Sequence, residues 1–325
     1  MCAESSSSVS ILIAAPAYKR NDLLEGLLAS LDALAPTARP GVHVDIAIID
    51  NDPDEGARPI VDAWAEKFSR PLYYHTEKQP GVTHVRNRAL DLAATFDFLA
   101  FIDDDEYADP RWLDELLARQ AETGAAAVFG PVVSVYPENA PDWMKAWAPH
   151  ATRMKADGMR SKPGATNNCL IDMKAVARAG LRFDAAMSLT GGEDTLFFSR
   201  MLDQGLTLAD ASRAIVYEHV PASRSNVKWL VTRWYRTGTT DALIRGRNQA
   251  RTVTRAKALL GGMGRIGVAL PLALLTAAIT LGQKPEAVLK WVYVAARGAG
   301  MIAFALGRDF KEYGRTTASP TETAA

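Results

Sequence analysis

An alternation of strand-like and helix-like patterns over the first 125 residues constrains the fold most. Apolar runs rich in β-branched residues predict strands at 9–16, 42–50, 72–77 and 96–102, and helical periodicity predicts helices at 22–34, 56–69, 82–94 and after Pro110. Strands joined through helices form right-handed crossovers, which build a mostly parallel sheet covered by helices on both faces. The sequence therefore predicts an α/β fold.

Four consecutive acids, Asp103, Asp104, Asp105 and Glu106, follow the last of these strands without a spacer. Adjacent carboxylates repel one another unless a cation or hydrogen-bond donors lie nearby. Parallel sheets bind ligands at the carboxyl ends of their strands, and Mg²⁺ or Mn²⁺ is typically held by carboxylates together with substrate phosphates. The run is therefore interpreted as a metal–diphosphate site, with a solvated acidic loop as the alternative.

A second acidic pair, Glu193 and Asp194, follows Gly191 and Gly192 at the predicted start of a helix over 193–205. The glycines let the backbone approach a ligand, and the helix dipole favours ionised carboxylates in the first turn. An ordinary helix cap would have the same pattern. A second pair of acids is nevertheless what a metal-assisted transfer requires as its general base.

Together these segments resemble the family 2 glycosyltransferases, whose catalytic domain has the GT-A fold. The resemblance rests on Pro16-Ala17-Tyr18-Lys19-Arg20, Asp45 to Asn51, Gly81 with Val85 to Ala89, Asp103-Asp104-Asp105 and Gly192-Glu193-Asp194. The longer Gly-Gly-Glu-Asp form, and the stretch EHVPASRSNVKWLVTRWYRTG that follows it, are similar to the bacterial exopolysaccharide, succinoglycan-type subgroup.

The resemblance implies a role for each matching residue. The donor-binding residues would be Pro16, Tyr18, Asp50, Arg86, Asp103 and Asp104. Asp105 would hold Mg²⁺ or Mn²⁺, and His219 would add a contact to the metal, although a lone histidine at a strand end is more often structural. Asp194 would take the proton of the acceptor hydroxyl, and Glu193 would orient the acceptor.

Departures from the family pattern narrow the activity. Leu230 stands where processive synthases have the glutamine of Gln-x-x-Arg-Trp, although Arg233 and Trp234 are present, which favours a single addition over polymerisation. The family's usual residues are also replaced at three other positions, by Ala17, Lys19 and Ala89. These replacements leave the identity of the donor's nucleobase open.

Charge separates the C-terminal part from the rest. Residues 224–325 contain 16 Lys and Arg against 5 Asp and Glu, whereas residues 1–223 contain 21 against 32. Residues 245–265 carry six cations and no acid, and the apolar stretches 266–283 and 287–306 follow. The pattern favours interfacial or re-entrant helices on an anionic membrane over a true span or a plain helical core. Nucleic acid is disfavoured because few aromatics lie among the cations.

These observations predict three regions: a lead-in at 1–8, a GT-A catalytic domain at 9–223 with a nucleotide-sugar half (9–125) and an acceptor half (126–223), and a membrane-associating region at 224–325. The predicted function is inverting transfer of a sugar from a nucleotide donor, UDP-linked in the preferred reading, to a lipid-linked oligosaccharide. It would take place at the cytoplasmic face of the membrane. Two alternatives stay open, a sugar transferase acting on polyprenyl phosphate and a non-catalytic scaffold of a polysaccharide assembly complex.

Overall fold

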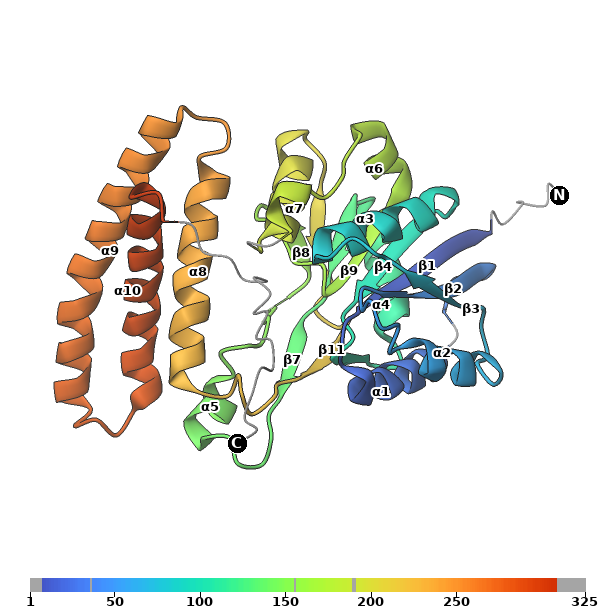
Figure 1. The fold of residues 1–325 in the computed structure, drawn as a ribbon, viewed down its shortest axis with the longest axis horizontal. Coiled ribbons are helices and arrows are strands. Elements are labelled where there is room, and N and C mark those ends of the chain that lie inside the picture. The colour runs from blue at the N-terminus through green and yellow to red at the C-terminus, as the bar shows by residue number, and fades with distance from the viewer. Residues whose placement is uncertain (1–7, 36, 155, 189–190, 309–325) are drawn as a thin grey trace, which may run out of the picture.

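The computed structural model describes residues 8–35, 37–154, 156–188 and 191–308 (Figure 1). The predicted lead-in, Ser8 apart, lies outside these ranges. The larger of two sheets has eight strands. In spatial order they are β3 (Leu72–Thr76), β2 (Val42–Asp50), β1 (Val9–Ala17), β4 (Phe98–Ile102), β9 (Asn168–Asp172), β6 (Ala127–Phe129), β10 (Leu208–Asp210) and β8 (Gly158–Arg160).

The predicted parallel sheet is confirmed in its first half. β1 pairs in parallel with both β2 and β4, and β2 pairs in parallel with β3. The second half adds β9, a strand that no pattern predicted, running antiparallel between β4 and β6. β9 is short and almost fully buried, so its sequence carries no period-2 alternation.

Helices cover both faces of this sheet, as predicted. One face is packed by α1 (Asn21–Asp32), α2 (Arg58–Ala65) and α4 (Trp112–Thr123), and the other by α3 (Val82–Leu92), α6 (Met173–Ala179) and α7 (Glu193–Asp203). Each face has its own cluster of buried apolar side chains. The two clusters place the core on either side of β1 and β4, whose carboxyl ends therefore sit on a rigid support.

A smaller sheet lies at the end of the larger one and continues the chain from β4. It consists of β5 (Glu106–Ala108), β11 (Val216–His219) and β7 (Val132–Val135), with β11 in the middle. β11 pairs antiparallel with β5, so that Glu218 lies opposite Glu106. Residues 137–166 contain the short helix α5 (Asp142–Trp147) as well as β8.

Three long helices follow the sheets: α8 (Val227–Arg245), α9 (Arg251–Ile279) and α10 (Pro285–Ala305). In Figure 1 they stand beside the α/β part, with α8 nearest to it. α10 packs on α8 with almost no side chain between them. A Cβ at Gly300 would lie 1.9 Å from the carbonyl oxygen of Tyr235, and one at Gly238 would lie 2.1 Å from that of Arg297. Glycine is therefore required on both helices.

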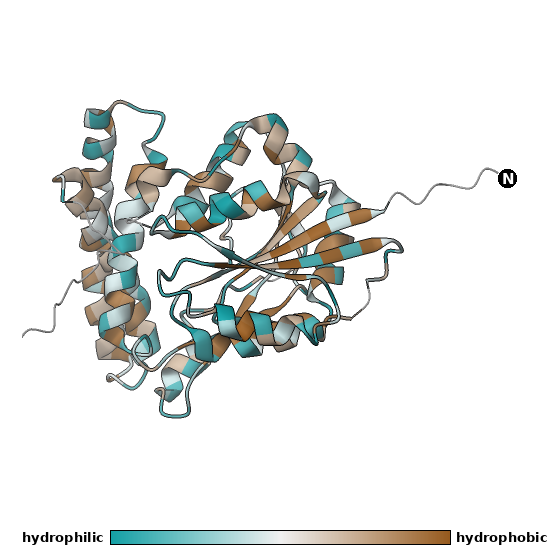
Figure 2. Ribbon diagram, turned by 45° about the vertical axis from the view of Figure 1, so that its right-hand side comes forward, coloured by the Kyte–Doolittle hydropathy of each residue, from teal (hydrophilic) through white to brown (hydrophobic). Residues whose placement is uncertain are grey.

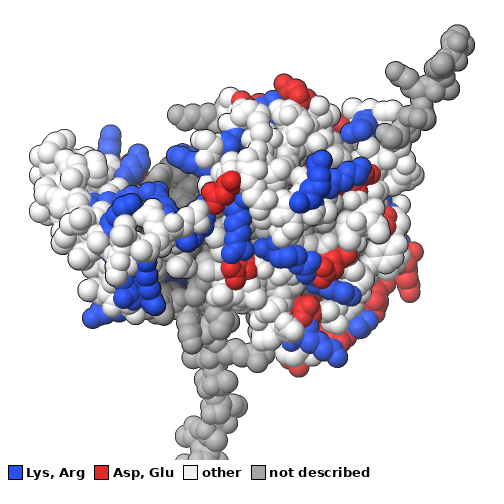
Figure 3. Space-filling model, turned by 90° about the horizontal axis from the view of Figure 1, so that it is seen from above, with Lys and Arg blue, Asp and Glu red and all other residues white. Residues whose placement is uncertain are grey.

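Within the described residues, α9 and α10 are long and apolar enough, by length and composition, to cross a membrane. α9 exposes a row of large apolar side chains: Leu260, Met263, Val268, Leu270, Leu274, Leu275 and Ile279. Brown, hydrophobic stretches mark the ribbon of the helical bundle in Figure 2. Leu274 and Ile279 are more than 70% exposed, far more than a soluble core helix allows. Seen from above in Figure 3, Lys and Arg gather on one end of the three-helix bundle beside a largely uncharged rim.

Candidate active site

A cleft of about 530 Å³ opens between the carboxyl end of β4, the start of α7 and one side of α8. This volume suits a ligand of ordinary cofactor or substrate size. Its lining includes Asp103 and Asp105 after β4, Glu193 and Asp194 at the start of α7, and Arg86 from α3. The structure thus brings together five residues that the sequence assigned to one site from three separate segments.

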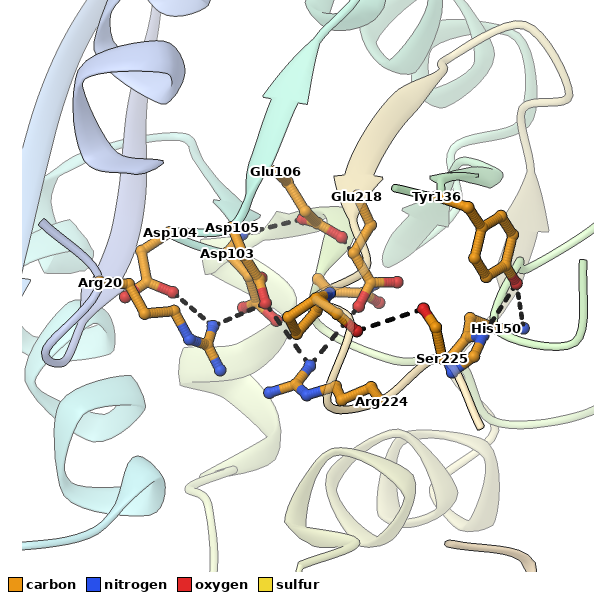
Figure 4. A network of polar contacts seen from close by, with 12 residues as sticks. Arg20, Asp103, Asp104, Asp105, Glu106, Tyr136, His150, Glu218, Arg224 and Ser225 are labelled. Carbon is orange, nitrogen blue, oxygen red and sulfur yellow. Dashed lines mark hydrogen bonds and ion pairs between the residues drawn. The ribbon is translucent and has the colours of Figure 1, made fainter. Parts of the chain in front are cut away.

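The acidic run is folded into a tight turn between β4 and β5. The backbone N–H of Asp103 donates to the Glu106 carboxylate at 2.9 Å, and the N–H of Glu106 donates back to the Asp103 carbonyl at 3.1 Å. Asn167 donates to the second oxygen of Glu106 at 2.9 Å. Glu106 therefore stabilises the turn, while Asp103 and Asp105 face the cleft (Figure 4).

Two arginines neutralise these acids. Arg20, directly after β1, lies 2.7 Å from the Asp104 carboxylate and 2.8 Å from that of Asp105. Arg224, in the connection between β11 and α8, lies 3.6 Å from Asp105 and 3.8 Å from Glu218. Figure 4 shows Asp105 between the two guanidinium groups. The sequence patterns had assigned a role to neither arginine.

The remaining electrostatics of the cluster favour an added cation. Burial, together with repulsion from its acidic neighbours, raises the pKa of Asp104 to about 7 although Arg20 opposes the shift. Burial and the nearby Asp105 also raise the pKa of Glu218 to about 7. Burial raises the pKa of Asp103 as well. Burial is the largest cause of each shift, so a cation that replaced the lost solvation would favour the ionised form of these carboxylates.

Carboxylate oxygens are the ligands that Mg²⁺ and Mn²⁺ prefer, so the donor set of this cluster fits such an ion. Among the described residues, no group of three His, Cys, Asp or Glu side chains converges as a closed metal site. A site completed by substrate phosphates needs only one or two protein carboxylates. Asp105 and Glu218 both line the cleft and both lie near Arg224, so they lie close to each other. A metal bound there would contact these two acids together.

His219 is not brought into this cluster. Along β11 successive side chains point to opposite faces, and Glu218 lines the cleft whereas His219 does not. The His219 ring is exposed and lies 5.2 Å from the ring of Tyr107. Strand alternation therefore turns the imidazole of His219 away from the cleft, and Glu218 is the acid of β11 that lines it.

Asp50 lies at the carboxyl end of β2, as predicted, but outside the lining of the cleft. It is 1% exposed, and its carboxylate accepts hydrogen bonds from the N–H groups of Asp52 (2.8 Å) and Ala57 (3.1 Å) and from the Tyr74 hydroxyl (2.8 Å). These donors fix the loop after β2 and occupy the carboxylate, and Asp50 does not line the cleft. Its position at a strand end is correct, but its contacts are structural.

The residues of the N-terminal motif Pro16-Ala17-Tyr18-Lys19-Arg20 lie at the edge of the acidic turn. The Tyr18 N–H donates to Asp104 at 3.0 Å, while the Tyr18 ring is 48% exposed. Pro16 pairs within the sheet opposite Ile49 of β2. Tyr18 thus presents a free aromatic surface next to the acids, whereas Pro16 serves the strand.

Glu193 and Arg86 form a buried ion pair between the starts of α7 and α3. Both side chains are less than 10% exposed. The pair joins a residue predicted to orient the acceptor to one predicted to bind the nucleotide. Asp194 lies one residue further along and is partly exposed. Its Oδ1 accepts from the N–H of Thr195 at 2.5 Å, and no described residue bonds Oδ2.

The wall opposite the acids was not foreseen from the sequence. His150, 9% exposed, stacks at 5.0 Å on Trp229 of α8, and Tyr136 bonds to its Nδ1 at 2.8 Å. Burial and the nearby Arg233 lower the pKa of His150 to about 4, so the ring is neutral. Thr166 is 1% exposed, and its hydroxyl, on the cleft lining, has no hydrogen-bond partner among the described residues.

The comparisons with known proteins agree with this geometry. Residues 12–185 match the model of glycosyl transferase family 2. The chain is 33% identical over 303 residues to the succinoglycan biosynthesis protein ExoM of Rhizobium meliloti (strain 1021), covering 91% of this chain and 93% of that protein.

Two solved structures share the fold. The mannosyltransferase PcManGT of Pyrobaculum calidifontis, solved with GDP-Man and Mn²⁺, aligns with a TM-score of 0.59 at 18% identity, over 92% of this chain and 86% of that one. Residues 1–349 of S. aureus TarS, solved with UDP-GlcNAc, align with a TM-score of 0.54 at 14% identity, over 92% and 90%. The chain has the GT-A fold with a C-terminal helical extension, and it belongs to glycosyl transferase family 2.

Proposed function

We propose that the protein is an inverting hexosyltransferase that moves a sugar from a UDP-linked donor to a lipid-linked oligosaccharide in exopolysaccharide or surface-glycan synthesis. The observation that carries the proposal is the shared cleft, in which Asp103 and Asp105 at the end of β4 lie across from Asp194 at the start of α7. The match to a succinoglycan biosynthesis protein along nearly the whole chain supports the glycan class.

The donor side of the proposal uses the acids and the buried arginine. Asp103 binds the ribose or the sugar, and Arg86, held by Glu193, faces the nucleotide. Asp105 and Glu218 would hold Mg²⁺ or Mn²⁺, which when bound neutralises the diphosphate and so improves the leaving group. The solved relatives bound to UDP-GlcNAc and to GDP-Man with Mn²⁺ support a nucleotide-sugar donor and a divalent ion.

The acceptor side requires a base. The acceptor hydroxyl oxygen bonds to the anomeric carbon while the bond from that carbon to the donor phosphate oxygen breaks. The electron pair leaves with the nucleoside diphosphate, and Oδ2 of Asp194 takes the hydroxyl proton. Attack opposite the leaving group inverts the anomeric configuration. Asp194 stands in the first turn of α7 and lines the cleft, as a base that contacts the acceptor requires.

The helical extension would hold the enzyme at the cytoplasmic face of the membrane, where a lipid-linked acceptor is found. Its exposed apolar row on α9 and its excess of cations support this placement. α8 belongs to the same bundle and lines the cleft through Arg233, Arg236 and Thr240, so the membrane-facing helices are joined directly to the site.

The proposal is tested by screening nucleotide sugars for thermal stabilisation in the presence of Mn²⁺ and then measuring hydrolysis of the stabilising donor. The wild-type protein should release the sugar slowly to water, and Asp105→Ala should lose both the Mn²⁺-dependent stabilisation and the hydrolysis. Arg213→Gln, on an ion pair with Glu115 outside the cleft, is the matched control. Absence of hydrolysis with every donor would support a non-catalytic scaffold.

A further inference from the structure

A second, smaller cavity of about 280 Å³ lies within the helical bundle, where α8 turns into α9. It is separate from the cleft and shares no lining residue with it. Its described lining residues include three cations, Arg245, Lys257 and Arg265, and no acid. The first comes from the end of α8 and the other two from α9, so the bundle itself brings the charges together.

These cations are held in place by neutral groups. The Lys257 ammonium donates to the side-chain oxygen of Gln249 at 2.8 Å, and Arg265 Nη1 lies 3.0 Å from the sulfur of Met301 on α10. Among the described residues, no carboxylate forms an ion pair with Arg245, Lys257 or Arg265. Two other arginines of this region do pair with acids, Arg297 with Asp241 and Arg247 with Asp203.

The walls of the cavity are fixed by close packing. A Cβ at Gly246 would lie 1.9 Å from the Thr254 side chain, so the turn between α8 and α9 admits only glycine there. The Thr254 hydroxyl donates to the Gly246 carbonyl at 3.2 Å. Gly261 leaves the floor of the cavity open because it has no side chain. A Cβ there would lie 3.0 Å from Met301 and 3.7 Å from Arg265 Nη1, and so would occupy this space. A rigid pocket with three cations suits a compact anion.

The surroundings indicate which anion. On the cavity side of α9 the exposed apolar row continues with Val268, 57% exposed, and Leu275, 54% exposed, which follow the cavity-lining Gly261 at seven-residue intervals. A ligand that carries a phosphate and a hydrocarbon chain could place the first in the cavity and lay the second along this row. Basic pockets between membrane-associated helices are suited to lipid headgroups in this way.

We propose that this cavity binds the phosphate headgroup of an anionic membrane lipid. The inference rests on the proposed membrane association, but not on sugar transfer. It makes membrane binding depend on particular cations. If the attraction were only diffuse, every surface cation of the bundle would contribute about equally to membrane binding.

The test is sedimentation of the full-length protein with vesicles of phosphatidylcholine, with or without phosphatidylglycerol. Arg251→Gln removes an exposed cation outside the cavity and should weaken binding about fivefold, the effect of one cation near an anionic surface. Arg265→Gln and Lys257→Gln should each weaken it about thirtyfold, because a charge-assisted hydrogen bond is lost as well. Equal effects of all three variants would overturn the proposal.

Gly261→Leu provides a test without any change of charge. Its side chain would fill the floor of the cavity, so binding to phosphatidylglycerol vesicles should fall by an amount similar to Arg265→Gln. The melting temperature and the donor hydrolysis of each variant report whether the fold and the transfer site are intact. Wild-type binding by a well-folded Gly261→Leu protein would argue against the cavity.

A titration with inorganic phosphate at constant ionic strength separates the two sources of the anion. Weak binding of free phosphate, with little displacement of the protein from vesicles, is the result expected for a lipid site. Displacement by inorganic phosphate alone would assign the cavity to a soluble phosphate and overturn the lipid assignment.

Discussion

Arg20 Nη1 lies 2.8 Å from the carboxylate of Asp105, the residue matched to the metal ligand of the family. Arg224 approaches the same carboxylate from the opposite connection, at 3.6 Å. The protein therefore supplies its own counter-ions to an acidic turn that would otherwise be strongly self-repelling. A divalent ion that binds Asp105 must compete with these guanidinium groups. The metal affinity therefore reflects the free energy of the metal–carboxylate contact minus that of the arginine–carboxylate contacts it replaces.

This competition predicts that Arg224→Gln binds Mn²⁺ more tightly than the wild type when nucleotide is absent. One partly exposed ion pair corresponds to ~1 kcal/mol, or about fivefold in affinity. Isothermal titration calorimetry with Mn²⁺ alone measures the change, and Arg213→Gln controls for the lost charge. Weaker Mn²⁺ binding by Arg224→Gln would show that the arginine assists the metal instead of competing with it.

The adjacent acids of α7 should respond differently to neutral substitution. Asp194→Asn keeps the contacts at the helix start but cannot accept a proton, so turnover should fall at least ~10²-fold while donor affinity stays close to wild type. Donor binding by calorimetry and transfer kinetics measure the two quantities separately.

Glu193→Gln leaves the buried Arg86 guanidinium without its anionic partner, and breaking a buried pair costs about 3 kcal/mol. A lower melting temperature is therefore its main expected effect. If Glu193→Gln lost turnover at an unchanged melting temperature while Asp194→Asn kept it, the two roles would have to be exchanged.

The pKa of His150 gives a prediction for stability against pH. Its folded value is about 4 and the ordinary value is 6.5, so the unfolded chain takes up the proton first as the pH falls. The contribution of His150 to stability is therefore complete above pH ~6.5 and is lost as the pH falls through that value toward ~4. At pH ~5 the loss is on the order of 1–2 kcal/mol.

Thermal melting of His150→Gln at pH ~7.5 and ~5 tests this prediction. The variant lacks the titrating ring, so its melting temperature should fall less between the two values than that of the wild type. A constant offset at both pH values would reflect lost packing on Trp229 alone.

The sequence predicted the parts of the molecule in which local pattern and tertiary environment agree. The strands β1 to β4 are continuous apolar runs separated by helical periodicity, and the acids end up at the predicted sheet edge because a parallel sheet puts its strand ends there. β9 was not predicted because a short, almost fully buried strand has no alternation of apolar and polar residues to detect.

The contacts of individual side chains could not be predicted in the same way. Asp50 and Asp103 both follow apolar strands, yet one binds the backbone of its own loop and the other faces the cleft. His150 reaches the site from a segment with no recognisable motif, and Arg224 lies in a stretch whose resemblance to the subgroup assigned it no role. Their roles depend on the packing of α8 against the small sheet and α5, which is set by contacts between residues far apart in the sequence.

That packing is tested at the glycines between α8 and α10. A Cβ at Gly300 would lie 1.9 Å from the Tyr235 carbonyl oxygen, so Gly300→Val must push the helices apart, and overpacking of this kind costs about 1–3 kcal/mol or more. α8 lines the cleft, so the variant should lose sugar transfer as well as thermal stability. Gly267→Val on α9 is the matched control, because a Cβ there meets no atom within 4 Å. Both proteins are compared by melting temperature and by donor hydrolysis. Full activity of Gly300→Val would show that the position of α8 against α10 does not govern the cleft, and the helical extension would then serve the membrane alone.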